Sequence, residues 1–411
     1  MKTLKRLHFN STSSFRNVRR STVWAVLCLA VYMSGAGIFA MAQSPRIIGF
    51  EAPNAGNAQG SGLGTQAENI NPWGAVAGLY ADANNVIHGF LRTAGGRLII
   101  FDAPGAGTAP GLYFKSTPAG TYGGQGTYAM SINSAGAIAG SYIDENNVGH
   151  GFVRASDGKF TSFYDPDADQ QSAYLGTFAW NINPAGVIAG NYWDSNSARH
   201  GFVRTPDGKF ANFDPSGSVS TFVCLASCIN PAGTVTGAYY DAGGVEHGFV
   251  RAPGGKITEF DVPGAGTDGS QGQGTWGTSI NTEGTVTGGY VTGDNVTHGY
   301  VRSPDGRITK FDVPGAGTDG SQYQGTVPEA INDTGIITGE YIDSNDVQHG
   351  FVRAPDGKSV YFDAPGAGAD AASYEGTVPL AINAAGEITG AYFDSNYVLH
   401  GFLLLAVPPQ F

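Results

Sequence analysis

The stretch Ile331–Phe362 reads INDTGIITGEYIDSNDVQHGFVRAPDGKSVYF and decides the fold, because it recurs seven times along the 411-residue chain. Each copy has an Ile-Asn pair, a Gly-containing run that mostly ends in Tyr-x-Asp, and a His-Gly-aromatic triplet; all but the last end in a Phe. The Ile-Asn pairs begin at Ile70, Ile132, Ile182, Ile229, Ile280, Ile331 and Ile382. Such self-similarity predicts one array of structural units rather than the two or three domains that length alone suggests.

Three turn signals divide each copy into four short strands. In the quoted copy they are Asn332 to Gly335, Asp343 to Asp346, and Pro355 to Gly357. Asn and Asp bond to their own backbone and Gly accepts a left-handed conformation, so these signals are typical of hairpins. The Asn-to-His spacing is 17 positions in all seven copies, and the His-to-Phe spacing is 13 in six. Each copy therefore predicts one small antiparallel sheet.

The two ends of the array complement each other. The seventh copy lacks a fourth strand, since Leu405 is soon followed by Pro408 and Pro409, whereas residues 46–53 match the fourth-strand pattern. We therefore predict an all-β fold, a seven-bladed β-propeller of four-stranded antiparallel blades with the ring closed by the N-terminal strand. Residues 43–411 would form this single domain of seven repeats. The alternative is an open β-solenoid, for which atypical capping copies are expected.

The tandem His-Gly-Phe units, with Gly-x-Ile-x-Gly-x-Tyr and Phe-Asp, resemble the bacterial extracellular repeats called the HAF family. The resemblance covers nearly the whole chain after residue 42. One departure is that Gly stands in the middle of every triplet, where the family name has Ala. The resemblance implies secretion and repetition, and it implies no assigned chemistry.

Residues 1–42 are expected to be a secretory signal peptide. They hold six basic residues and no acid, an apolar run from Val23 to about Phe39, and the small residues Ala40 and Ala42 before Gln43. The alternative is an uncleaved membrane anchor, for which the apolar run is near the lower length limit. We expect a secreted, periplasmic or cell-surface protein.

Charge and cysteine content limit the partners. Of 22 basic residues, six lie in the first 42, so the remainder has 16 basic against 34 acidic residues. Nucleic acid and, after cleavage of the signal, membranes are therefore unexpected partners. Cys224 and Cys228 could form a disulfide only if the chain bends between them, because residues four apart on an extended strand are about 13 Å apart. We expect a monomer that binds an extracellular polymer or protein.

The histidines of the triplets invite a metal or catalytic interpretation, but geometry opposes it. A His on the third strand of each blade lies several strand spacings from the axis, so histidines of different blades cannot converge on one ion. A structural His bonded to a nearby Asp or Asn is favoured. The Arg after each triplet and the Asp after the terminal Phe suggest a second recurring pair. The structural histidines are His88, His150, His200, His247, His298, His349 and His400.

Length variation points to one face of the ring. The first and third hairpins are constant, whereas the links between copies and the polar second turns share the other face, and binding residues tend to lie on variable loops. Aromatic, Asn and Asp side chains there suit sugars; the alternative is that they only shape turns. The candidate ligand-binding residues are Tyr113, Phe114, Lys115, Tyr122, Asp144, Asn146, Asp194, Asn196, Asp343, Asn345, Asp394 and Asn396.

Asp165, Asp167 and Asp169 alternate as Ca²⁺ loops often begin, although the Gly and distal Glu of a full loop are missing. No other cofactor is expected. Signatures such as Gly-x-Ser-x-Gly and His-Glu-x-x-His are absent from the sequence. We expect a binding or interaction propeller, for carbohydrate or another extracellular polymer. The alternatives are a polysaccharide lyase or hydrolase with acids and Tyr at the central channel, and a structural cell-envelope protein.

Overall fold

The computed structural model describes residues 46–61, 63–110, 124–223, 227–322, 324–370 and 375–405. These residues form β-strands and two short 3₁₀-helices, η1 (Gly269–Gln271) and η2 (Gly320–Gln322), with no α-helix among them. None of the helices in these ranges has the length and apolar character needed to cross a membrane. The expected signal peptide, residues 1–42, lies outside the described residues.

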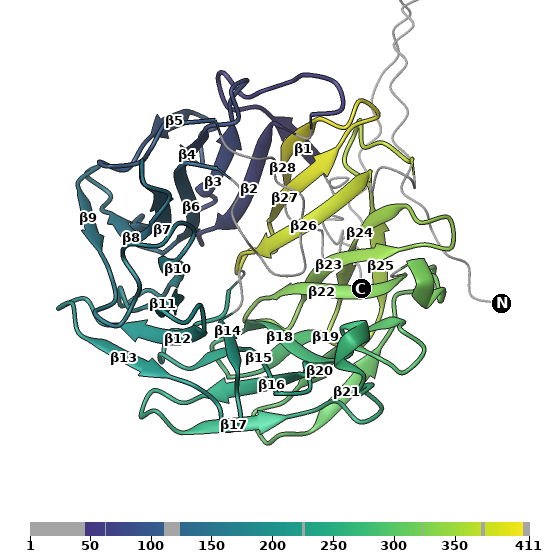
Figure 1. The fold of residues 1–411 in the computed structure, drawn as a ribbon. Coiled ribbons are helices and arrows are strands. Elements are labelled where there is room, and N and C mark those ends of the chain that lie inside the picture. The colour runs from purple at the N-terminus through teal and green to yellow at the C-terminus, as the bar shows by residue number, and fades with distance from the viewer. Residues whose placement is uncertain are drawn as a thin grey trace, which may run out of the picture.

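The strands form groups of four around a common centre, as in a β-propeller (Figure 1). The first strand of each group lies nearest the centre. The first groups are β2 (Thr65–Ile70), β3 (Val76–Ala81), β4 (Ile87–Arg92), β5 (Leu98–Phe101), then β6 (Gly126–Ile132), β7 (Ile138–Ile143), β8 (Gly149–Arg154), β9 (Phe160–Phe163). The next are β10 (Gly176–Ile182), β11 (Ile188–Trp193), β12 (Arg199–Arg204), β13 (Phe210–Phe213), then β14 (Ser220–Val223), β15 (Val235–Tyr240), β16 (Glu246–Arg251), β17 (Ile257–Phe260). They are followed by β18 (Gly274–Ile280), β19 (Val286–Val291), β20 (Thr297–Arg302), β21 (Ile308–Phe311), and β22 (Gly325–Ile331), β23 (Ile337–Ile342), β24 (Gln348–Arg353), β25 (Ser359–Phe362).

The last group combines both ends of the described chain. It contains β26 (Gly376–Ile382), β27 (Ile388–Phe393), β28 (Leu399–Leu405) and β1 (Arg46–Phe50). Strand β1 pairs antiparallel with β28, with Arg46 opposite Leu405 and Phe50 opposite Gly401. The sequence had assigned residues 46–53 the same position.

Most neighbouring groups are joined by single parallel bridges between described residues. The start of β4 bridges to the start of β6, where Ile87 is opposite Gly126. Gly126 has a φ of 128°, and a Cβ there would lie 2.0 Å from the backbone oxygen of Ile87. Only glycine allows this approach of two backbones. The same close contact recurs at Gly176, Gly274, Gly325 and Gly376.

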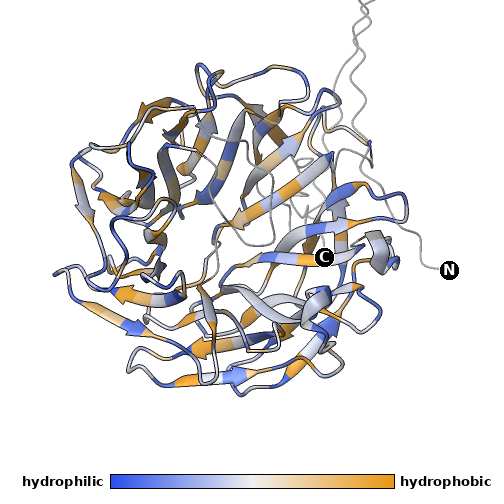
Figure 2. Cartoon of the chain, viewed as in Figure 1, coloured by the Kyte–Doolittle hydropathy of each residue, from blue (hydrophilic) through white to orange (hydrophobic). Residues whose placement is uncertain are grey.

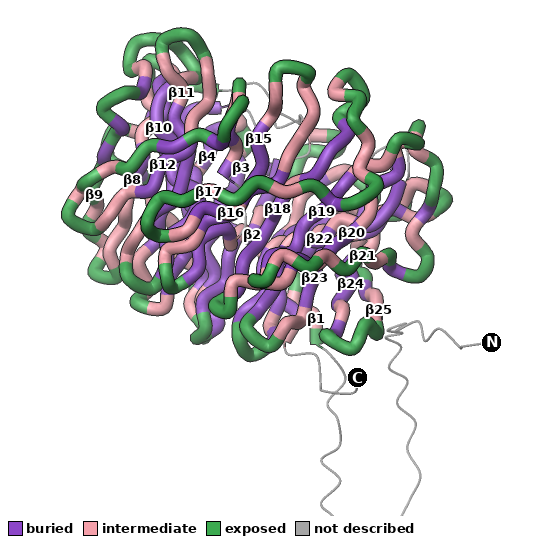
Figure 3. The backbone as a smooth tube through the Cα atoms, turned by 90° about the horizontal axis from the view of Figure 1, so that it is seen from below, coloured by how far each residue is buried: buried purple, intermediate pink, exposed green. Residues whose placement is uncertain are grey.

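The buried side chains lie between the groups. Figure 2 shows apolar and polar residues interspersed along the strands, and Figure 3 shows burial concentrated in the inner strands, while outer strands such as β17 and the connecting loops are more exposed. The triplet aromatic is fully buried in every copy. Phe351, for example, meets the terminal Phe311 of the preceding group edge to face, with ring centroids 6.4 Å apart. These aromatic contacts hold adjacent groups together.

The expected pair between the triplet Arg and the Asp after the terminal Phe is wrong. The Cζ atom of Arg353 lies 4.4 Å from the ring centroid of Phe311 instead. The register explains the difference, since Phe362 is opposite Gly350 and Ser359 is opposite Arg353, which leaves the following Asp363 beside the His. The same Arg–Phe contact is made by Arg92 with Phe50, Arg154 with Phe101, Arg204 with Phe163, Arg251 with Phe213 and Arg302 with Phe260.

The Asn of each Ile-Asn pair has two roles. Asn332 Oδ1 accepts hydrogen bonds from Thr334 N and Ile336 N, at 3.1 and 3.0 Å, and so shapes its own hairpin. Its Nδ2 donates to the backbone oxygen of Asn383 in the next group, at 3.2 Å. The corresponding donations run from Asn71 to Asn133, Asn133 to Asn183, Asn183 to Asn230, Asn230 to Asn281, Asn281 to Asn332 and Asn383 to Asn71.

Candidate ligand-binding site

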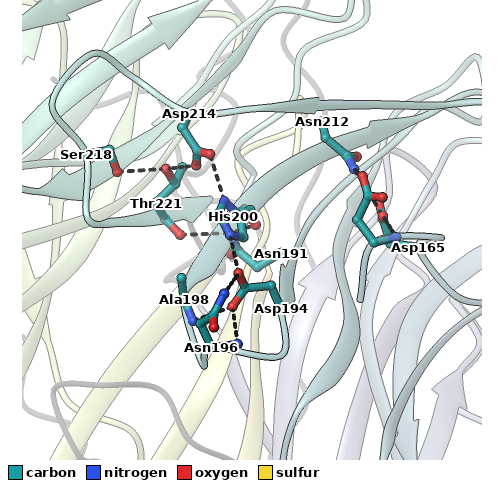
Figure 4. A network of polar contacts seen from close by, with 11 residues as sticks. Asp165, Asn191, Asp194, Asn196, Ala198, His200, Asn212, Asp214, Ser218 and Thr221 are labelled. Atoms are coloured by element: carbon teal, nitrogen blue, oxygen red, sulfur yellow. Dashed lines mark hydrogen bonds and ion pairs between the residues drawn. The ribbon is translucent and has the colours of Figure 1, made fainter. Parts of the chain in front are cut away.

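Each triplet His stacks on the Tyr of the second strand and contacts carboxylates. His200 illustrates the arrangement in Figure 4, where Nδ1 is 2.7 Å from Asp214 Oδ2 and Nε2 is 3.7 Å from Asp194 Oδ2. Its ring is stacked on Tyr192, with centroids 4.8 Å apart. All these carboxylates come from the same group as their His, because the strand register places them opposite it. In the last group the partner of His400 is Glu51, which follows β1 and so lies at the other end of the described chain.

The Asp of each polar second turn is used mainly by its own turn. Asp194 Oδ1 accepts from Asn196 N at 2.9 Å and from Ala198 N at 2.8 Å, and Asn196 Nδ2 donates to the other carboxylate oxygen at 3.1 Å. Burial opposes the charge of Asp194, but these hydrogen bonds outweigh burial and lower its pKa. Asp343 with Asn345, and Asp394 with Asn396, repeat the pattern. These predicted ligand-binding residues remain on separate groups.

The second group departs from this pattern. Tyr164 stands where most other copies have the second acid, so among the described residues Asp144 is the one carboxylate that His150 contacts, with Nε2 3.2 Å from Oδ2. The contact is shorter than the 3.7 Å of the equivalent pair in the third group. The side-chain amide of Asn146 consequently does not donate to Asp144, and it has no hydrogen-bond partner among the described residues. This amide is available to a ligand.

A cavity of about 350 Å³ lies beside this turn. It is lined by the start of the link after β5 and by the polar turn after β7, and so brings together two of the predicted residues, Asp144 and Asn146. Burial opposes the charge of Asp144, but hydrogen bonds from Val148 N, His150 and Asn146 N outweigh burial and lower its pKa. The lining residues are Gly105, Ala106, Gly107, Thr108, Asp144, Glu145 and Asn146.

Gln125 fixes the two walls of the cavity relative to each other. Its Oε1 accepts from Ala109 N at 2.8 Å, and its Nε2 donates to Glu145 O and Asn147 Oδ1, both at 3.1 Å. A Cβ on Gly107 would lie 2.8 Å from the backbone carbonyl carbon of Asp144 and 2.2 Å from Gln125 Oε1, so a side chain here would force the backbone or Gln125 to move. The cavity is therefore held open by hydrogen bonds that already exist without a ligand.

Other predicted site residues are placed differently. Tyr113, Phe114, Lys115 and Tyr122 lie outside the described residues. The three alternating aspartates do not form one cluster: Asp165 and Asp167 both accept from Asn212 Nδ2, at 3.1 and 2.9 Å, whereas Asp169 caps its own turn. In the part of the chain that the structure describes, no three acidic, His or Cys side chains are arranged to hold a metal ion. Ca²⁺ binding here remains a prediction, as does a disulfide of the buried Cys228, because Cys224 lies outside the described residues.

Three glutamates near the centre were missed in the sequence. Glu68 and Glu329 occupy β-bulges in the innermost strands β2 and β22, and Glu340 lies on β23. Burial raises the pKa of Glu68 and of Glu340 to about 8, and it also raises the pKa of Glu329, helped by the nearby charges of Glu340 and Glu68. The available signal was a Glu at a bulge position where other copies carry Met130, Trp180 or Leu380.

No family model matches the chain, and no curated protein sequence is similar to it. Among solved structures, BP39L lectin from Burkholderia pseudomallei is 10% identical over 89% of this chain and 97% of that chain, with a TM-score of 0.49. The β-propeller domain of the Trilobed protease from Pyrococcus furiosus is 9% identical over 83% and 95%, with a TM-score of 0.47. TolB from Acinetobacter baumannii is 10% identical over 88% and 80%, with a TM-score of 0.42. These similarities concern the fold alone.

Proposed function

We propose that the protein is an exported, carbohydrate-binding β-propeller of seven four-stranded blades, in which β1 completes the last blade and closes the ring. The pairing of β1 with β28 supports this closure. The hydrogen bond from Asn383 to Asn71 supports it independently, because it joins the last group to the first. An open solenoid offers no reason for either contact.

The cavity lined by Gly105 to Thr108 and Asp144 to Asn146 is the proposed sugar site, and the unused amide of Asn146 is the observation that carries the proposal. Sugars offer many hydroxyl groups, and each can pair with a carboxylate acceptor such as Asp144 or Glu145, or with an amide donor. A preformed cavity with fixed polar groups avoids the cost of ordering the site during binding.

The test is a glycan array of bacterial and plant polysaccharide fragments, followed by calorimetric titration of the best fragment. Asn146→Ala should weaken binding by about two- to tenfold, the range expected for one lost hydrogen bond. Asn345→Ala is the matched control, since that amide serves its own turn by donating to Asp343. Binding of no glycan by the wild type, or equal losses in both variants, would contradict the proposal.

A second candidate function is cleavage of a polysaccharide by a hydrolase or lyase. The observation that favours it is the pair Glu329 and Glu340, because carboxyl groups with raised pKa values can serve as general acids near neutral pH. Release of reducing ends or of unsaturated uronates from the best-bound polysaccharide, lost in Glu329→Gln, would support this candidate. If no turnover is seen in the absence of an added cofactor, the enzyme candidate fails and the proposed binding function is unaffected.

A further inference from the structure

One junction between groups differs from the others. The last residue of each second strand is opposite the first residue of the third strand, and five copies have mostly apolar or small pairs there. They are Ala81 with Ile87, Ile143 with Gly149, Val291 with Thr297, Ile342 with Gln348, and Phe393 with Leu399. The third group instead has Trp193 opposite Arg199, and the fourth has Tyr240 opposite Glu246.

The backbone is also different at this junction. At the six remaining junctions, a parallel bridge joins the third strand of one group to the start of the next group. Leu399 with Gly64 is one of these bridges. No such bridge joins β12 to β14 in the described residues, and Ser220 stands where five other copies begin their first strand with Gly.

Arg199 is held by aromatic rings rather than by acids. Its Cζ lies 4.6 Å from the ring centroid of Phe222 and 5.7 Å from that of Trp193. Among the described residues, the guanidinium makes no hydrogen bond and no ion pair within 4.0 Å, and its Nε is buried without a partner. A cation that is fixed in position but unpaired is suited to receive an anion, because little conformational freedom remains to be lost.

Glu246 does not neutralise Arg199 fully. No ion pair links them within 4.0 Å. Burial raises the pKa of Glu246 to about 7, against the opposing effects of Tyr240, Arg199 and His247. Near neutral pH the carboxyl group is therefore protonated in a large fraction of molecules, and in that form it can donate a hydrogen bond to a ligand.

We propose that this junction binds the carboxylate of an acidic sugar, with Arg199 as the anion partner and Trp193 and Phe222 as the apolar walls. The planar guanidinium matches a carboxylate in geometry, and the aromatic walls suit the ring of a sugar. The assignment of a sugar rests on the proposed carbohydrate-binding function, since the junction flanks the second turn and so lies on the same face as the cavity. The chain carries a net charge of −12, which repels anions, so attraction of a carboxylate to this junction would come from the local charge of Arg199.

The test compares tri-galacturonic acid with its carboxyl-reduced trimer by calorimetric titration. The wild type should bind the acid at least about tenfold more tightly than the reduced trimer, and Arg199→Gln should remove that preference. Arg204→Gln is the control on the same strand: that Arg also stacks on a Phe, at 4.3 Å from Phe163, but it lies at the far end of β12. It should leave binding unchanged.

Two further variants keep the outcome decisive. Arg199→Lys retains the charge and should retain part of the preference, even if Arg199→Gln unfolds. Glu246→Gln mimics the protonated carboxyl group and should bind the acid at least as well as the wild type. Equal affinity for both trimers, no saturable binding of the acid by the wild type, or loss of binding in Glu246→Gln would overturn the proposal. If neutral fragments still bind in an Asn146-dependent way, the proposed function stands without this second site.

Discussion

Asn383 donates its side-chain Nδ2 to the backbone oxygen of Asn71, 3.2 Å away and 312 positions earlier in the chain. The six other donations of this kind connect groups that follow one another in the sequence, so this contact joins the two ends of the array. The side chain of Asn383 is buried, and its Oδ1 also accepts from Ala385 N and Glu387 N.

Replacement of Asn383 by Ala should destabilise the protein by about 1 to 3 kcal/mol, because it leaves the buried Asn71 oxygen and the hairpin amides without these partners. Thermal and urea unfolding measure the effect. Asn396→Ala is the control, since that exposed amide donates to Asp394 within its own turn and its loss should cost little. Equal stability of Asn383→Ala and the wild type would show that the contact does not hold the ends together.

The pair His400 and Glu51 should make the attachment of β1 dependent on pH. The hydrogen bond to Glu51 raises the pKa of His400, against the effect of burial, and Asp394 adds to the rise. A raised His pKa means that the stabilisation is complete below the unfolded pKa of about 6.5 and is lost as pH rises through the folded pKa.

Glu51→Gln should therefore destabilise more at about pH 5.5 than at about pH 9, by less than about 1 kcal/mol because the pair is partly exposed. Urea unfolding at both pH values measures the difference. Asp157→Asn removes a carboxylate that pairs with Lys159 at an exposed hairpin, and its effect should be the same at both pH values. A cost of Glu51→Gln that grows toward high pH would contradict the assignment.

Gln125→Ala should weaken sugar binding at the proposed cavity more than it weakens the fold. The variant loses the hydrogen bonds to Ala109, Glu145 and Asn147 that set the distance between the cavity walls. Gln324→Ala is the matched control, because Gln324 makes equivalent bonds to Asp319 and Asp346 in another group. Both variants should lower the melting temperature similarly, and only Gln125→Ala should reduce affinity in calorimetry. Equal affinities of Gln125→Ala and Gln324→Ala for the sugar would show that the cavity is not where the sugar binds.

The buried glutamates should make the wild type less stable as pH rises. The folded pKa of Glu340 is about 8, above its ordinary value of 4.5, so the folded state holds a proton that the unfolded state releases, and stability falls between these two values. Glu340→Gln should remove this loss of stability. The stability of the variant relative to the wild type should be about 2 to 4 kcal/mol greater at pH 9 than at pH 5. The exposed Glu283→Gln should give no such difference. Parallel pH profiles for the wild type and Glu340→Gln would refute the assignment.

The repeat pattern was enough to locate most strands, because its information is local. The turn from Asn332 to Gly335 and the period-2 alternation around His349 depend on near neighbours in sequence, and the same signals recur in each copy. Residues 46–53 were assigned beside the seventh copy from pattern alone, and β1 pairs with β28 as that assignment requires. The Arg–Asp pair failed because face alternation alone does not give the register between strands.

The candidate site could be predicted from the sequence only in part. Asp144 and Asn146 were predicted together with six equivalent residues in other copies. Only their surroundings in the structure distinguish these two residues from the other six. The substitution at Tyr164 shifts His150 toward Asp144 and leaves the Asn146 amide unused, which depends on contacts between three strands and turns of the blade.

The sequence by itself determined the all-β repeat, its turns and the position of each His, because hydrogen bonding within hairpins and side-chain alternation are short-range effects. The tertiary structure decided which copies of the repeat carry candidate binding or ionisable groups that the other copies lack. The cavity beside Asn146, the surroundings of the Arg199 guanidinium and the raised pKa values of Glu68, Glu329 and Glu340 depend on residues beyond a single copy of the repeat. Burial and partner distances across neighbouring groups set these properties, and neither can be read from one copy of the repeat.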